Sequence, residues 1–187
     1  MPKIEDGTGT GSLVAVSTTN RMLVSAETTS SLAVASATRQ DAFVASTEQE
    51  VALTAGTSAV LLVKNDSPFP LAVGNISAST DTECVITLYR DPGTTGTIVS
   101  SGTAVTPAQL NFGSSKQFTG EAYRGADGLT VGVATDIVAL GRIQPGFVLL
   151  PLSGAIILNT SDTIGVTVAA SAATIVSVNM TLGYLAS

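Results

Sequence analysis

The sequence contains no histidine and no tryptophan, and it has a single cysteine, Cys84. Without imidazole there is no Ser-His-Asp triad, no Cys-His dyad and no histidine-ligated metal site. One thiol makes neither a disulfide within the chain nor a thiolate zinc site. Cys84 lies in the apolar stretch Cys84–Tyr89, so we expect a small buried hydrophobic side chain rather than a reactive thiol. These absences predict a protein that is not an enzyme and needs no cofactor.

Charge is also sparse: eight Lys and Arg and fourteen Asp and Glu among 187 residues give a net charge of −6. The basic residues are scattered, whereas binding to nucleic acid or to a membrane surface needs them clustered. Apolar runs such as Phe147–Leu152 are far shorter than the about 20 residues that span a bilayer. The first residues, MPKIEDGTGTG, lack the apolar segment of a signal peptide. We expect neither a nucleic-acid nor a membrane partner.

Carboxylates are the remaining candidates for acid–base chemistry. Asp81 with Glu83, and Asp127 with Asp136, are close in sequence and would be the pairs to consider for glycoside hydrolysis. Sites of that kind usually add aromatic platforms for sugars, and the chain has only five Phe and three Tyr. No D-x-D-x-D-G calcium loop occurs either. We interpret these four carboxylates as solvated residues at strand ends and turns.

What the chain does have is Val, Thr, Ser, Gly and Ala in short alternating stretches, and β-branched residues pack well on a pleated sheet. Turn signals recur along the chain, as at Asn65–Pro68 and Asp91–Gly93. The pattern predicts an all-β fold, an antiparallel β-sandwich of jelly-roll type. The expected strands are Val60–Lys64, Leu71–Ser77, Glu83–Arg90, Thr103–Thr106, Leu129–Val133, Asp136–Leu140, Phe147–Leu150, Ala155–Leu158, Thr163–Val168 and Thr174–Tyr184.

The first 50 residues differ from the rest, because they hold nine of the charged residues and few large apolar ones. We therefore predict an extended N-terminal arm at 1–50 and a sandwich domain at 51–187. The arm would dock on another subunit by strand addition. Its expected anchors are Met22, Leu23, Leu32 and Phe43. The alternative is that the short strands of this region belong to the sandwich itself.

The stretch from Pro107 to Gly125, PAQLNFGSSKQFTGEAYRG, concentrates aromatic and charged side chains. Phe112, Phe118 and Tyr123 lie within twelve residues of one another, with Arg124 beside the last. Aromatic residues and Arg are enriched at the centres of protein interfaces. We predict a contact loop whose interface residues are these four. The alternative is that the rings close one end of the sandwich, and the two interpretations are compatible.

The same stretch carries a family resemblance. Thr106–Lys116 (TPAQLNFGSSK), followed by Phe118–Tyr123 (FTGEAY), resembles a mid-chain pattern of virion proteins of tailed bacteriophages, T-P-x-x-L/R-N-x-G-S-G-x-x-A-x-G-x-x-Y/F. Ser115 stands where that pattern more often has Gly. Further similar pieces are Asn20–Val24, Gln40–Phe43, Ile156–Leu158 and Leu182–Tyr184.

The resemblance implies a structural component of a virion, such as a capsid decoration or cement protein. Its implied partners are the major capsid protein or other virion proteins, and it would form a homo-oligomer, a trimer or dimer. Its implied location is the capsid surface of a particle assembled in the bacterial cytoplasm. The alternative is a tail, baseplate or head-fibre component with an adhesion role. A host-side binding module is less favoured, because no secretion signal is evident.

Overall fold

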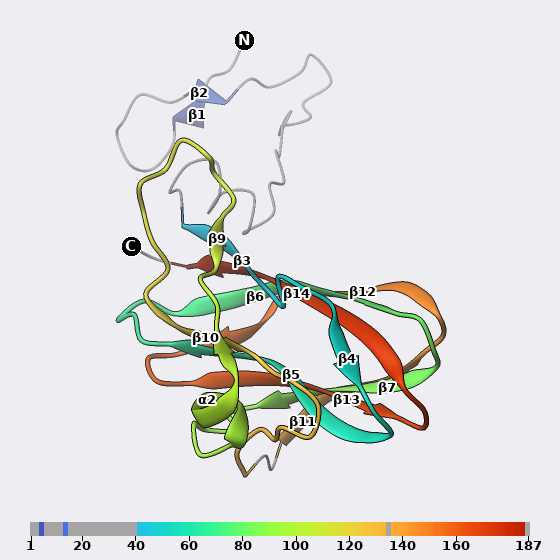
Figure 1. Ribbon diagram of the computed structural model, residues 1–187. Coiled ribbons are helices and arrows are strands. Elements are labelled where there is room, and N and C mark those ends of the chain that lie inside the picture. The colour runs from blue at the N-terminus through green and yellow to red at the C-terminus, as the bar shows by residue number, and fades with distance from the viewer. Residues whose placement is uncertain (1–3, 6–12, 15–40, 134–135, 186–187) are drawn as a thin grey trace, which may run out of the picture.

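The computed structural model describes residues 4–5, 13–14, 41–133 and 136–185. In this part of the chain nearly all regular structure is β-strand, arranged as two antiparallel sheets packed against each other (Figure 1). The two-residue strands β1 (Ile4–Glu5) and β2 (Leu13–Val14) pair with each other outside these sheets. The all-β sandwich expected from the sequence is confirmed.

One sheet contains the long strand β5 and is called the β5 sheet. Its strands lie in the order β11-β7-β13-β5-β10-β8, and all neighbours are antiparallel. β11 and β8 are therefore its edge strands. The six strands are β5 (Gly56–Asn65), β7 (Cys84–Arg90), β8 (Thr103–Ala104), β10 (Gly120–Arg124), β11 (Asp136–Ile143) and β13 (Thr163–Ala170).

The other sheet contains β6 and is called the β6 sheet. Its order is β12-β6-β14-β3-β9, and β4 also pairs with β14. β12 and β9 are the edge strands of this sheet. The strands are β3 (Ala42–Ser46), β4 (Val51–Leu53), β6 (Leu71–Thr80), β9 (Ala108–Gln109), β12 (Gly146–Leu158) and β14 (Thr174–Tyr184).

The connections explain how a chain of simple alternating strands makes two layers. The chain crosses from one sheet to the other between β5 and β6, between β6 and β7, and at every step from β11 to β14. The later crossings return the chain beside strands that it left earlier: β12 pairs with β6, β13 lies between β5 and β7, and β14 lies between β6 and β3. This repeated crossing is the arrangement of a jelly-roll-like sandwich.

The core between the sheets is made mainly of aliphatic side chains with period-2 spacing. β14 shows the pattern clearly: Val176, Val178, Met180 and Leu182 are completely buried, whereas Ile175 on the other face is exposed. Alternation of this kind buries one face of each strand and leaves the other to solvent. The expected strand at Thr174–Tyr184 is thus confirmed together with its inward face.

The outer face of the β5 sheet is partly covered, which the sequence did not indicate. The five-residue helix α2 (Thr97–Ser101) and the segment Leu129–Val133 lie over β5. The amide of Ile98 donates to the carbonyl of Thr130 at 3.0 Å, and the amide of Ala59 donates to the carbonyl of Leu129 at 2.7 Å. The prediction of a strand at Leu129–Val133 is wrong, because its backbone bonds go to α2 and to one end of β5.

The sandwich also includes chain that the sequence assigned to the N-terminal arm. β3 pairs along β14, with Phe43 opposite Leu182, and its other side pairs with β9. Phe43 is only 1% exposed and belongs to the core. The prediction of Phe43 as an anchor on another subunit is therefore wrong. The described sandwich begins at Asp41, and the boundary predicted after residue 50 falls inside its β6 sheet.

Candidate protein-interaction loop

The stretch singled out in the sequence forms a bridge between the two sheets. The chain leaves the β5 sheet at β8, joins the edge of the β6 sheet as β9, and returns to the β5 sheet as β10. Residues 105–119, called the contact loop, make this crossing and rise from one end of the sandwich as the yellow loop in Figure 1. The two-residue strand β9 pairs with Phe43 and Val44 of β3, which fixes the first part of the loop on the β6 sheet.

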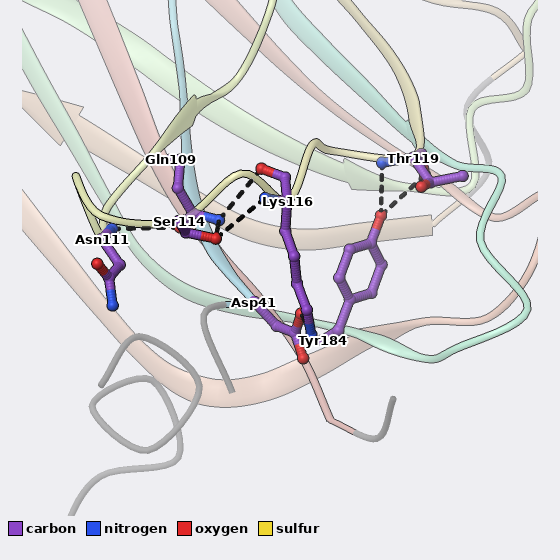
Figure 2. A network of polar contacts seen from close by, with 7 residues as sticks. All are labelled: Asp41, Gln109, Asn111, Ser114, Lys116, Thr119 and Tyr184. Carbon is purple, nitrogen blue, oxygen red and sulfur yellow. Dashed lines mark hydrogen bonds and ion pairs between the residues drawn. The ribbon is translucent and has the colours of Figure 1, made fainter. Parts of the chain in front are cut away.

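A partly buried ion pair holds the loop to the start of β3. Lys116 Nζ lies 2.7 Å from Asp41 Oδ1, and the Asp41 side chain is only 4% exposed whereas that of Lys116 is 46% exposed. Figure 2 shows the lysine side chain reaching from the loop to this carboxylate. A buried carboxylate is strongly disfavoured without a charged partner. Asp41 therefore stabilises the position of the loop.

Tyr184, the last residue of β14, holds the far end of the loop. Its hydroxyl donates to the Thr119 carbonyl at 2.8 Å and accepts from the Thr119 amide at 3.0 Å (Figure 2). The Tyr184 ring contacts Phe43 edge to face and Phe118 in a stacked arrangement, with centroids 5.9 and 6.2 Å apart. Burial raises the pKa of the Tyr184 phenol above its usual value, despite these hydrogen bonds.

The tip of the loop is organised by its own side chains. Asn111 Oδ1 accepts from the amide of Gly113 at 3.0 Å, and Ser114 Oγ accepts from the amide of Lys116 at 3.1 Å. Gln109 Nε2 donates to Ser114 Oγ and to the carbonyl of Lys116, both at 3.4 Å. Asn and Ser side chains stabilise tight turns in this way. The tip is thus a set of consecutive turns rather than an open chain.

Gly120 permits the return into β10. Its φ is +157°, and a Cβ at this position would collide with the carbonyl oxygen of Lys64. Only glycine accommodates both the backbone conformation and the close approach to β5.

This frame presents one aromatic ring to solvent. Phe112 is as exposed as in an extended chain (102%), and Leu110 beside it is 36% exposed. Phe118, by contrast, is half-buried and packs against the core residue Phe43, with ring centroids 5.6 Å apart. The two interpretations of the sequence therefore apply to different rings: Phe118 closes the end of the sandwich and Phe112 projects from it.

The other predicted interface residues are largely engaged within the chain. Tyr123 is half-buried beside Ile98 and donates to Glu121 Oε2 at 3.2 Å. The guanidinium of Arg124 donates to the Thr47 carbonyl and to Thr103 Oγ1, both at 3.4 Å. Met22, Leu23 and Leu32 lie outside the described residues. Asp41 and Tyr184, which position the loop, are far from it in sequence. They lie in the similar pieces Gln40–Phe43 and Leu182–Tyr184, but nothing in the sequence connected them with the loop.

The carboxylates weighed for catalysis hold the ends of strands. Asp81 accepts from Thr174 Oγ1 and from the amide of Ile175, both at 2.8 Å, and these bonds hold its pKa below the usual range. Asp127 accepts from the hydroxyl of Thr54 at 2.7 Å and from the amide of Thr54 at 2.9 Å, with the same effect on its pKa. Carboxylates with lowered pKa values remain ionised and anchor turns.

Glu83 and Cys84 likewise have structural surroundings. Glu83 forms an ion pair with Arg142 and accepts from Gln144 Nε2 at 3.0 Å, which lowers its pKa. Cys84 is buried, as the sequence predicted, and burial raises the pKa of its thiol.

Within residues 41–133 and 136–185, no three Asp, Glu or Cys side chains gather as a metal site would need. No helix of the described chain is long and apolar enough to cross a membrane.

Comparisons with known proteins leave the chain without an assigned family. No family model matches it, and no curated protein matches it. Among solved structures, T=1 particles derived from infectious bursal virus align with 77% of this chain and 40% of that chain, at 11% identity and a TM-score of 0.21. The chain thus spans less than half of that protein, and at this TM-score the likeness does not show a shared fold.

Proposed function

We propose that this chain is a structural protein of a tailed-bacteriophage virion that decorates the capsid and stabilises its lattice. It binds the major capsid protein on the outer surface of the head, and the tip of the contact loop makes this contact. The protein lies on the capsid surface of a particle that is assembled in the bacterial cytoplasm. The support comes from the resemblance of Thr106–Tyr123 to virion proteins, together with the way in which this same stretch is built.

The observation that carries the proposal is the exposed Phe112 on an anchored loop. Aromatic residues in the centre of an interface contribute a large share of the binding free energy. A loop that already has its bound shape loses little conformational entropy when it binds. The ion pair of Asp41 with Lys116 and the hydrogen bonds of Tyr184 to Thr119 supply this preorganisation. An exposed ring held in this way suits a pocket on a partner protein.

The test is binding of the purified chain to undecorated heads of the phage whose genome carries this sequence, measured by co-sedimentation. Phe112→Ser should weaken binding by roughly thirtyfold, the effect of losing about 2 kcal/mol at an interface centre. Val133→Ser is the matched control, because Val133 is 83% exposed but lies outside the contact loop. The proposal fails if Phe112→Ser and Val133→Ser bind like the unchanged protein.

The number of copies per particle separates decoration from the second candidate, a tail, baseplate or head-fibre component. A decoration protein covers a lattice and is present in hundreds of copies. A count on the order of a dozen or fewer, following the symmetry of a tail or a fibre, would replace the first candidate by the second. Quantitative mass spectrometry of purified virions against the major capsid protein gives this number.

A further inference from the structure

The four edges of the two sheets are protected to different degrees. β8 and β9 are only two residues long, and β11 carries the charged residues Asp136 and Arg142. Short strands and charged side chains are the usual protection of a sheet edge against pairing with another chain. β12 has neither over Gly146–Leu150. Among the described sheet edges, this segment is the one left both long and uncharged.

The side chains of this segment alternate between the core and solvent. Val148 and Leu150 pack against the core, whereas Phe147 is 71% exposed and Leu149 is 51% exposed. No charged residue occurs between Arg142 and Asp162. The exposed strand face is therefore apolar and neutral in a chain with a net charge of −6.

The hydrogen bonds of β6 show which way the backbone of β12 points. Pro151 is opposite Asn75, and the Asn75 amide and carbonyl both bond Thr181 Oγ1 on β14, at 2.6 and 3.2 Å. Asn75 thus turns its backbone groups away from β12, so Asn75 and Pro151 form a non-hydrogen-bonded pair. In an antiparallel ladder such pairs alternate with bonded ones. Leu149 and Phe147 lie two and four residues before Pro151, so they also occupy non-hydrogen-bonded positions relative to β6. Their N–H and C=O groups therefore point to the free edge of the sheet.

We propose that β12 pairs with β12 of a second copy of this chain, antiparallel about a two-fold axis at Val148. In this register Phe147 is opposite Leu149 of the second copy, and each such pair exchanges two backbone hydrogen bonds. Pro145 is opposite Pro151 of the second copy, so the residues that lack an N–H meet where the paired segment ends. An aromatic ring facing an aliphatic side chain across the strands adds to the pairing.

A second copy fits this edge for reasons of charge and of symmetry. Two acidic chains repel each other, and the repulsion is smallest where uncharged surfaces meet. The two prolines lie at equal distances on either side of Val148, so the segment is complementary to itself in one register. The outer face beside it is also neutral: Ser79, opposite Phe147, bonds Ser177 Oγ at 2.7 Å.

The test is sedimentation equilibrium of the full chain between about 1 and about 100 µM, the range in which a small strand interface forms. The unchanged protein should be a dimer at the upper end. Phe147→Lys and Leu149→Glu, made singly, should each raise the dissociation constant at least about tenfold, because each places an unpaired charge in an apolar contact. The double variant Phe147→Lys with Leu149→Glu should recover the dimer, since the two new charges face each other across the axis.

The double variant makes the register itself testable. Recovery requires residue 147 of one copy to face residue 149 of the other. Dimers in both single variants, a monomer or trimer for the unchanged chain, or no recovery in the double variant would overturn the proposal. If the edge binds a capsid protein instead, the unchanged chain stays monomeric and Phe147→Lys abolishes binding to heads. Circular dichroism and thermal unfolding of each variant establish that it is folded.

The β12 edge would form the homo-oligomer expected of the proposed function. The dimerisation test, however, uses the isolated chain and needs no particle. Phe112→Ser serves as the control here, because the contact loop lies at the opposite edges of both sheets from β11 and β12. That variant should dimerise like the unchanged chain. A chain that dimerises but does not bind heads would contradict the proposed function alone.

Discussion

At the scale of single residues, the polar side chains that matter most are those that fix the contact loop. Asp41 is buried and has one charged partner, Lys116, while its second oxygen, Oδ2, has no hydrogen-bond partner among the described residues. A half-satisfied buried carboxylate depends heavily on the partner that remains. The ion pair is therefore an asymmetric one, in which the lysine can return to water and the aspartate cannot.

This asymmetry predicts unequal effects of removing either partner. Lys116→Met should lower the free energy of unfolding by about 2 kcal/mol, because it leaves the buried Asp41 carboxylate unpaired. Asp41→Asn should lower it by about 1 kcal/mol, since Lys116 is then free to be solvated. Urea unfolding of both variants and of the double variant gives the values and the coupling. Equal losses would contradict the burial of Asp41 as the cause.

Tyr184 gives a prediction for alkaline pH. Burial raises the pKa of its phenol in the folded chain, so the unfolded chain loses this proton first. Its contribution to stability is fully present below about pH 10, the ordinary tyrosine value, and is lost as the pH rises through the folded pKa. Tyr184→Phe keeps the ring but removes the bonds to Thr119, and should lower the unfolding free energy at pH 8 by about 1 kcal/mol.

Urea unfolding between pH 8 and pH 11 tests this. The difference between the unchanged chain and Tyr184→Phe should shrink as the pH rises. Tyr123→Phe is a suitable comparison, because Tyr123 donates to an exposed carboxylate instead of holding the loop. A difference that stays constant to pH 11 would show that Tyr184 does not titrate with unfolding.

At the scale of elements, the period-2 patterns predicted most strands but not their surroundings. The turn at Asn65–Pro68 formed as expected, with Asn65 Oδ1 accepting from the amide of Ser67 at 3.0 Å. Phe147–Leu150 and Ala155–Leu158 were expected as two strands and form the single strand β12, with an irregularity between Pro151 and Ile156. Alternation is a local property, whereas continuity across an irregularity is decided by pairing with β6.

The same limit applies to the candidate site. Phe112 and Phe118 are alike in sequence, and their opposite positions follow from contacts with Phe43 and Tyr184, which are distant along the chain. The exposed side of β12 was also not evident, because alternation gives two faces without saying which is buried. Sequence therefore located the loop and the sandwich, and tertiary contacts decided which residues they present.

The place of β3 in the β6 sheet gives a prediction for that element. Phe43→Ala removes a side chain that is 1% exposed and contacts two other rings. The free energy of unfolding should fall by about 3–5 kcal/mol, the usual loss for a buried phenylalanine. Urea unfolding of the isolated protein measures it. A loss below about 1 kcal/mol, the effect of a surface position, would return Phe43 to the role of an external anchor.

At the scale of the whole molecule, the sandwich is assembled from segments far apart in sequence. The amide of Val178 in β14 donates to Thr47 Oγ1, just after β3, although these residues are 131 positions apart. β14, the strand nearest the C-terminus, lies between β6 and β3. The β6 sheet is therefore complete only when both ends of the described sandwich have met. Truncation at either end acts on the middle of this sheet.

Two deletions at the N-terminal end should therefore behave differently. A chain that starts at Asp41 keeps every strand of the described sandwich, and should remain folded and soluble. A chain that starts at Glu48 lacks β3, so the edge of β14 and the rings of Phe118 and Tyr184 lose their cover. Exposed strand edges and buried apolar groups released in this way lead to aggregation. The longer deletion should aggregate or unfold.

The comparison uses solubility, circular dichroism and thermal unfolding of the two truncated chains beside the full one. If both remain folded, β3 contributes little to the sandwich and the boundary after residue 50 is restored. If both aggregate, residues before Asp41 are needed for the fold. With the shorter deletion folded, its binding to undecorated heads tests the predicted docking of Met22, Leu23 and Leu32 separately from folding. Loss of binding with the sandwich intact is the result that such docking requires.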